Sequence, residues 1–151
     1  MEYYEKSLDI SLSIFGERHH YAAACYINIG RVYDSQGDYA KALEYYKKSL
    51  EISLSVFGEC HPDVAMSYNN IGGVYSSQGD YANALEYYKK SLEIRLSIFG
   101  ECHPYTVDIM GNIAVSYLKM EDYDNALLYI KRGAAAGSEA CANFLRDNGV
   151  E

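Results

Sequence analysis

The sequence predicts an all-α solenoid in which pairs of helices stack on one another. Residues 20–61 and 62–103 are two copies of a 42-residue unit and are identical at 31 positions. Within each unit, apolar residues recur at helical spacing and glycines separate the runs. Self-similarity at a fixed period of this size is typical of proteins whose units bury their apolar faces only by stacking on neighbours.

The first helix of the first unit is expected over residues 21–36. Its apolar residues recur at steps of three and four, at Ala22, Tyr26, Ile29 and Tyr33. Gly37 can end this helix because glycine adopts the left-handed conformation without a Cβ penalty. Asp38 can then cap the following helix by accepting a hydrogen bond from an early backbone N–H.

The second helix of the unit carries a longer apolar stripe and ends at Gly58. The stripe consists of Tyr39, Ala42, Leu43, Tyr46, Leu50, Leu54 and Phe57. Pro62 follows in the linker, where its fixed φ suits the first turn of the next helix. The same reasoning predicts helices over 62–78 and 81–99, and in a divergent third copy over 104–120 and 123–136. In that copy Glu121 replaces the turn glycine and Asp122 keeps the cap.

The two ends of the chain differ in kind. Ser138 can cap a short amphipathic helix that closes at Asn148-Gly149, as a terminal capping helix should. Residues 3–15 instead copy residues 45–57, so they predict the second helix of a repeat whose first helix is absent. We therefore expect one solenoid domain, cut from the C-terminal end of a longer array. Its parts are the truncated repeat with its linker (1–19), three repeats (20–61, 62–103 and 104–137) and the cap (138–151).

Composition and charge exclude several classes of partner. The net charge of −8 disfavours nucleic acid and anionic membranes, which require clustered Lys and Arg. No apolar run approaches the roughly 20 residues that span a bilayer, and no secretion signal opens the chain. The four cysteines show no close pairing and fit free thiols in a reducing compartment. We therefore expect a cytoplasmic protein.

The pattern Tyr26-x-x-Ile29-Gly30-x-x-Tyr33, followed by Ala42-x-x-x-Tyr46, resembles the tetratricopeptide repeat signature. The usual period is about 34 residues. The longer period here, with Gly-Glu-x-His-Pro at 58–62 and 100–104, is similar to the kinesin light chain and nephrocystin-like subclass. The resemblance implies a right-handed superhelix of about eight helices. It also implies a protein or peptide partner, bound in the concave groove that the first helices line.

Differences between the two units concentrate in the first helix. Eight of the eleven fall between residues 20 and 34, and positions 24, 27, 31 and 34 share one helical stripe. Such a stripe is either tuned to a partner or an exposed surface that drifts freely. Asn28, Asn70 and Asn112 instead recur unchanged, once per first helix. Their amides offer donors and an acceptor that could hold the backbone of an extended peptide, or that could make a structural bond between helices.

These observations give the expected peptide contacts: Asn28, Arg31, Met66, Asn69, Asn70, Gly73, Asn112 and Lys119. Some family members hold a C-terminal carboxylate with a basic clamp. The positions of this sequence that correspond to the clamp residues hold Ile27, Arg31, Asn70, Asp108 and Asn112. Only Asn70 matches, and Asp108 would repel a carboxylate, so this ligand is not expected. Acidic cargo peptides call for a basic groove, whereas this one has mixed charge.

No constellation in the sequence predicts chemistry. Cys60-His61 and Cys102-His103 lie too far apart for the short chelate loops of zinc sites, and we assign them to the junctions. No phosphate-binding loop or nucleophile motif occurs. We therefore expect a protein that is not an enzyme, with no catalytic or metal site and no cofactor.

Two other functions stay open at this point. The chain could be a self-assembly or regulatory arm that forms a homodimer through residues 3–15. Leu8, Leu12 and Phe15 would otherwise lie partly uncovered there, and burying each is worth about 1.5–3 kcal/mol. It could also be the sensor arm of a larger enzyme.

Overall fold

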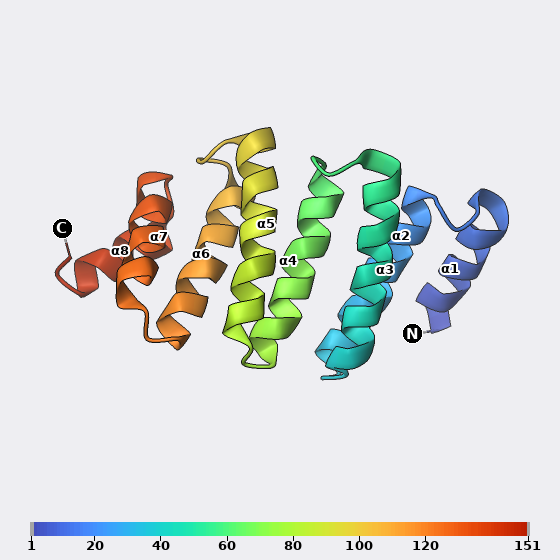
Figure 1. Ribbon diagram of the computed structural model, residues 1–151, viewed down its shortest axis with the longest axis horizontal. Helices are drawn as coiled ribbons and strands as arrows, with labels where there is room; N and C mark the ends of the chain where they lie inside the picture. Colours follow the sequence, from blue (N-terminus) through green and yellow to red (C-terminus); the bar gives the residue numbers. More distant parts are fainter. Residues whose placement is uncertain (1, 151) are drawn as a thin grey trace.

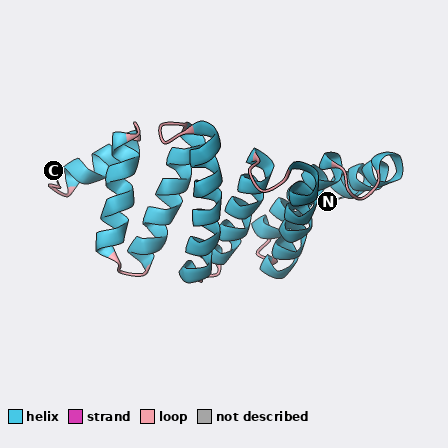
Figure 2. Ribbon diagram, turned by 45° about the horizontal axis from the view of Figure 1, so that its top comes forward, coloured by secondary structure: helices cyan, strands magenta, loops and turns pink. Residues whose placement is uncertain are grey.

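The computed structural model describes residues 2–150, which form eight helices stacked in chain order (Figure 1). The helices are α1 (Glu2–Phe15), α2 (His20–Ser35), α3 (Tyr39–Phe57), α4 (Pro62–Ser77), α5 (Tyr81–Phe99), α6 (Pro104–Lys119), α7 (Tyr123–Ala135) and α8 (Glu139–Asp147). The termini lie at opposite ends of the stack, and helices and loops alone make up the described chain (Figures 1 and 2). The predicted all-α solenoid is confirmed.

The turns within each unit follow the predicted chemistry. Gly37 and Gly79 have φ of 76° and 78°, the left-handed conformation that ends a helix. Glu121 adopts φ of 60° at the equivalent turn, although this region favours glycine. The side chains of Asp38 and Asp122 cap the next helix by accepting backbone N–H groups at 3.2 Å.

The junctions between units contain a device that sequence analysis missed. His19, His61 and His103 cap α2, α4 and α6 through Nδ1, which accepts the N–H of the second residue after each at 3.2–3.3 Å. Each ring also stacks on the phenylalanine that ends the preceding helix, with centroids 3.9–4.6 Å apart. Because His19 is the cap, α2 begins at His20, one residue before the start expected from the apolar spacing.

Close packing within each unit depends on a glycine facing a tyrosine. A Cβ atom at Gly30 would lie 2.7 Å from the ring of Tyr46, and one at Gly72 would lie 2.7 Å from the ring of Tyr88. No real Cβ approaches a ring so closely, so glycine lets α2 meet α3 and α4 meet α5. In the third unit, Ala114 replaces the glycine and the smaller Ile130 replaces the tyrosine.

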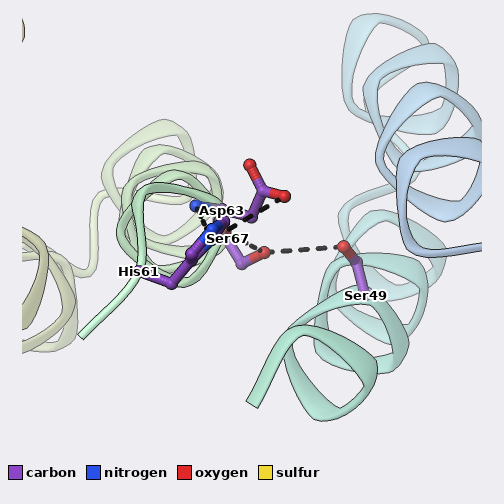
Figure 3. A network of polar contacts seen from close by, with 4 residues as sticks. All are labelled: Ser49, His61, Asp63 and Ser67. Carbon is purple, nitrogen blue, oxygen red and sulfur yellow. Dashed lines mark hydrogen bonds and ion pairs between the residues drawn. The ribbon is translucent and has the colours of Figure 1, made fainter. Parts of the chain in front are cut away.

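Neighbouring units meet through apolar and polar contacts. Ile27, Ala42, Tyr46, Ile71 and Val74 form one buried cluster across α2, α3 and α4. Figure 3 shows polar contacts between α3 and α4, where the hydroxyls of Ser49 and Ser67 are 3.5 Å apart. Ser67 donates to the backbone carbonyl of Asp63 at 2.9 Å, so α3 is joined to the first turn of α4.

The open face of α1 includes more residues than expected. Leu8 and Leu12 are half-buried, because they pack against the cluster that contains Ala22 and Ile52. The most exposed large apolar side chains of α1 are Tyr3, Ile10, Ile14 and Phe15. Ile10 is 59% exposed, whereas its counterpart Ile52 is 9% exposed because α2 covers it. Leu8 and Leu12 therefore keep part of their surface uncovered, as expected, and the most exposed part of the apolar face lies at Tyr3, Ile10 and Ile14 beside Phe15.

No helix within residues 2–150 has both the length and the apolar character needed to cross a membrane.

Candidate binding surface on the first helices

The eight predicted contact residues all reach the surface of α2, α4 or α6. Arg31, Met66, Asn112 and Lys119 are exposed, and Asn28, Asn69, Asn70 and Gly73 are half-buried. Met66 is the large apolar side chain among them, with 38% of its surface exposed. The helical spacing that selected these positions therefore places them where a partner could touch them.

The three repeated asparagines do not behave alike. Asn112 donates from Nδ2 to Oδ1 of Asn69 at 3.2 Å, which links α6 to α4 across the unit boundary. The side chains of Asn28 and Asn70 have no hydrogen-bond partner among residues 2–150. A structural bond thus occupies one position of the series, and two amides stay available.

The surface is hollowed at its N-terminal end, between α1 and α2. Asn28 and Arg31 border a cavity of about 290 Å³ together with Tyr4 and Ser35. Asn28 also borders an adjacent cavity of about 410 Å³, whose walls include Ile10 and Phe15. An available amide and a guanidinium therefore flank space that a ligand could fill.

One position of the predicted stripe turns away from this surface. Ile27 is 7% exposed and belongs to the core cluster with Ile71 and Val74. An apolar side chain at this position packs against α4, whereas the polar Asn69 at the equivalent position of α4 stays half-buried. The stripe of the first unit is therefore reduced to positions 24, 31 and 34.

Charges at the first unit lie next to a buried phenol. Burial raises the pKa of Tyr46 to about 12, the carboxylate of Asp34 adds to this rise, and Arg31 opposes it. Burial likewise raises the pKa of Asp34. Arg31 and Asp34 thus present opposite charges at one place on α2.

Arg95 is a residue near this surface that sequence reasoning did not select. Its guanidinium lies 5.5 Å from the ring centre of Tyr105 and donates to the backbone carbonyl of the same residue. Burial lowers the pKa of Arg95, and the nearby carboxylate of Asp108 opposes that shift. The sequence could have marked Arg95 as a candidate, because Ser53 and Arg95 are one of the eleven differences between the two units. Arg95 was not among the predicted contacts because it lies on the second helix of its unit, and those contacts were all placed on first helices.

A solenoid of paired helices with a partly polar, hollowed face on its first helices belongs to the class of α-helical repeat scaffolds. The tetratricopeptide repeat profile matches residues 2–55 and 63–136. The chain therefore belongs to the tetratricopeptide repeat family, whose members generally serve in protein–protein interaction and are typically non-catalytic. No curated protein sequence matches this chain.

Solved structures support the same assignment. BtubC (BKLC) from P. vanneervenii superposes with a TM-score of 0.83 at 26% identity, over 94% of this chain and 56% of its own. A putative kinesin light chain with nearly identical TPR-like repeats, from Podosopora anserina, superposes with a TM-score of 0.78 at 19% identity, over 89% of this chain and 64% of its own. The N-terminal domain of stress-induced protein-1 from C. elegans superposes with a TM-score of 0.71 at 19% identity, over 85% of this chain and 94% of its own. The predicted subclass is thus represented among the neighbours, and this chain spans less than two thirds of the first two.

Proposed function

We propose that this protein is an interaction module that binds an extended peptide segment of a partner protein along α2, α4 and α6. The observation that carries the proposal is the pair of half-buried amides, Asn28 and Asn70, which have no partner among the described residues. A primary amide can donate to a peptide carbonyl and accept from a peptide N–H, so it can bind the peptide backbone whatever the side chains of the peptide are. Family membership supports a protein partner.

The surroundings of the two amides favour a peptide of mixed character. Met66 offers a flexible apolar contact beside Asn70. Arg31 and Asp108 place charges of opposite sign on the surface, so neither a strongly acidic nor a strongly basic segment is matched along its whole length. The ligand that fits best carries an apolar anchor and few charges.

Replacing Asn70 by alanine is expected to weaken peptide binding about tenfold and to leave melting nearly unchanged. Each lost hydrogen bond to a ligand costs about 1 kcal/mol, and the partner groups left unpaired cost more. A ligand can be selected from a random peptide display library, labelled, and titrated by fluorescence anisotropy. Asn143→Ala, which removes an exposed amide from α8, is the matched control.

The contrary result would be a marked loss of stability with unchanged binding, which would make Asn70 a scaffold residue. A second groove variant, Arg31→Glu, reverses a charge at an exposed position and should alter binding without unfolding the chain. Unchanged affinity in both variants would contradict peptide binding on this surface.

Self-assembly through α1 is the second candidate, and the exposed Ile10 and Ile14 favour it. Pairing of two copies would bury this apolar face, with a gain of about 1.5–3 kcal/mol for each large side chain. Light scattering across a concentration series should then show twice the monomer mass, and Ile10→Asp with Ile14→Asp should restore the monomer. A strict monomer at all concentrations would eliminate this function.

A further inference from the structure

A second groove lies away from the first-helix surface, between the α3–α4 loop and helices α4 and α5. Its volume is about 490 Å³. Two carboxylates, an aromatic ring, an ammonium group and small side chains border it: Glu59, Cys60, Tyr68, Lys90, Glu93, Ile94 and Ser97. Its position at a junction means that the next unit offers an equivalent place for comparison.

The third unit shows what the equivalent carboxylate holds. Nε and Nη2 of Arg132 both lie 2.9 Å from Oε1 of Glu101, the counterpart of Glu59. The same guanidinium lies 5.4 Å from the ring centre of Tyr129. The junction carboxylate and a neighbouring tyrosine thus hold a guanidinium group by charge, hydrogen bonds and a cation–π contact.

The second unit lacks that guanidinium for an identifiable reason. Lys90 occupies the position of Arg132 and lies 5.2 Å from the ring centre of Tyr87, but its Nζ is held by Glu86 at 2.7 Å. The counterpart of Glu86 in α7 is Leu128, which cannot compete for Arg132. Glu86 therefore holds the lysine along α5, where its ammonium borders the groove 5.9 Å from the ring centre of Tyr68 but forms no ion pair with Glu59.

Two carboxylates in the second unit remain without a cation as a result. Glu59 and Glu93 form no ion pair within residues 2–150, and both are exposed at the groove. The counterpart of Glu93 in α7 is Ala135, so the groove has one carboxylate more than the junction at which Arg132 binds Glu101. Tyr68 lies on the same wall, and the ammonium of Lys90 is 5.9 Å from the centre of its ring.

We propose that this groove binds an arginine side chain of a partner protein, in the place that Arg132 takes at the next junction. Arginine fits better than lysine because its planar guanidinium can bond a carboxylate through two N–H groups and stack on a ring at the same time. The groove is distinct from the asparagine surface, so a partner can use it whether or not a peptide binds there.

The test uses acetyl-arginine methylamide as the probe and the ¹⁵N-labelled chain as the target. We expect amide shifts confined to residues 58–60, the part of α4 near Tyr68, and residues 93–97, with weaker effects from the lysine analogue. Glu59→Gln with Glu93→Gln should weaken binding about fivefold, since exposed ion pairs are individually weak. Glu5→Gln with Asp9→Asn, an equal change of charge on α1, should leave binding unchanged.

A gain-of-contact variant sharpens the result. Glu86→Leu with Lys90→Arg reproduces the α7 sequence, so residue 90 should bind Glu59 and exclude the probe. Shifts located instead at Asn28 on α2 or Asp108 on α6, or equal binding by this variant and the parent chain, would overturn the proposal. Asn70→Ala should leave probe binding intact, which separates this site from the peptide surface.

Discussion

Replacing Ile71 by alanine is expected to lower the free energy of unfolding by about 2–5 kcal/mol. Ile71 is fully buried in the cluster that joins α4 to α2 and α3. Truncation removes favourable burial and leaves a cavity that the rigid helix pairs can only partly close. A solenoid is stabilised by contacts between nearest neighbours alone, so the loss falls on the boundary between the first and second units.

Urea denaturation followed by circular dichroism measures this effect. Ile10→Ala makes the same chemical change at a position that is 59% exposed, so it should alter stability by no more than about 0.5 kcal/mol. Splitting of the transition of Ile71→Ala into two steps would show that the units have become uncoupled. Equal destabilisation by the two variants would contradict the stacking of units through this cluster.

Features that depend on neighbours in the chain could be predicted from the sequence. Helix positions follow from apolar spacing, and the turns follow from Gly37 with Asp38 and their copies, because capping involves only residues a few positions apart. Even the unusual turn at Glu121 was located, since the repeat register identified it. Local chemistry repeated three times leaves little ambiguity about the fold.

Features that depend on contacts between elements were missed or misplaced. Ile27 lies on the helical stripe of exposed positions, but it is buried because α4 lies against that side of α2. The cap formed by His61 was missed for another reason: it is local, since Nδ1 accepts the N–H of Asp63 and the ring stacks on Phe57, but histidine is not among the usual N-cap residues. Spacing along one helix cannot reveal which neighbour covers each side of it.

The candidate binding surface shows the same division. The repeat register correctly placed the asparagines on the first helices, because one residue per unit must occupy one row. It could not distinguish Asn112, which donates to Asn69, from Asn70, which has no partner among residues 2–150. The identity of residue 69 decides the difference, since Ile27 occupies the same position in α2 and offers no acceptor.

Replacing Gly72 by alanine is expected to destabilise the protein by about 1–3 kcal/mol, the usual cost of overpacking. The added Cβ would lie 2.7 Å from the ring of Tyr88 and 3.2 Å from the backbone oxygen of Ala84. Neither obstacle can move freely, because the ring is buried and the oxygen belongs to α5. The clash should therefore outweigh the gain of about 1 kcal/mol that alanine offers over glycine in a helix.

The adjacent glycine provides a control that separates packing from helix propensity. A Cβ at Gly73 has a single neighbour within 4 Å, the hydroxyl of Tyr88 at 3.9 Å, so Gly73→Ala should stabilise the chain by about 0.5–1 kcal/mol. Thermal melting of the two variants should thus shift in opposite directions. Stabilisation by both would mean that α4 and α5 are not held as closely as the tyrosine and glycine require.

The third unit indicates how the clash can be relieved. It pairs Ala114 with Ile130, where the second unit pairs Gly72 with Tyr88. Combining Gly72→Ala with Tyr88→Ile should therefore recover most of the lost stability, because the smaller side chain leaves room for the new methyl group. Additive destabilisation by the two changes would instead show that the two positions do not pack as a pair, and that the third unit tolerates alanine for another reason.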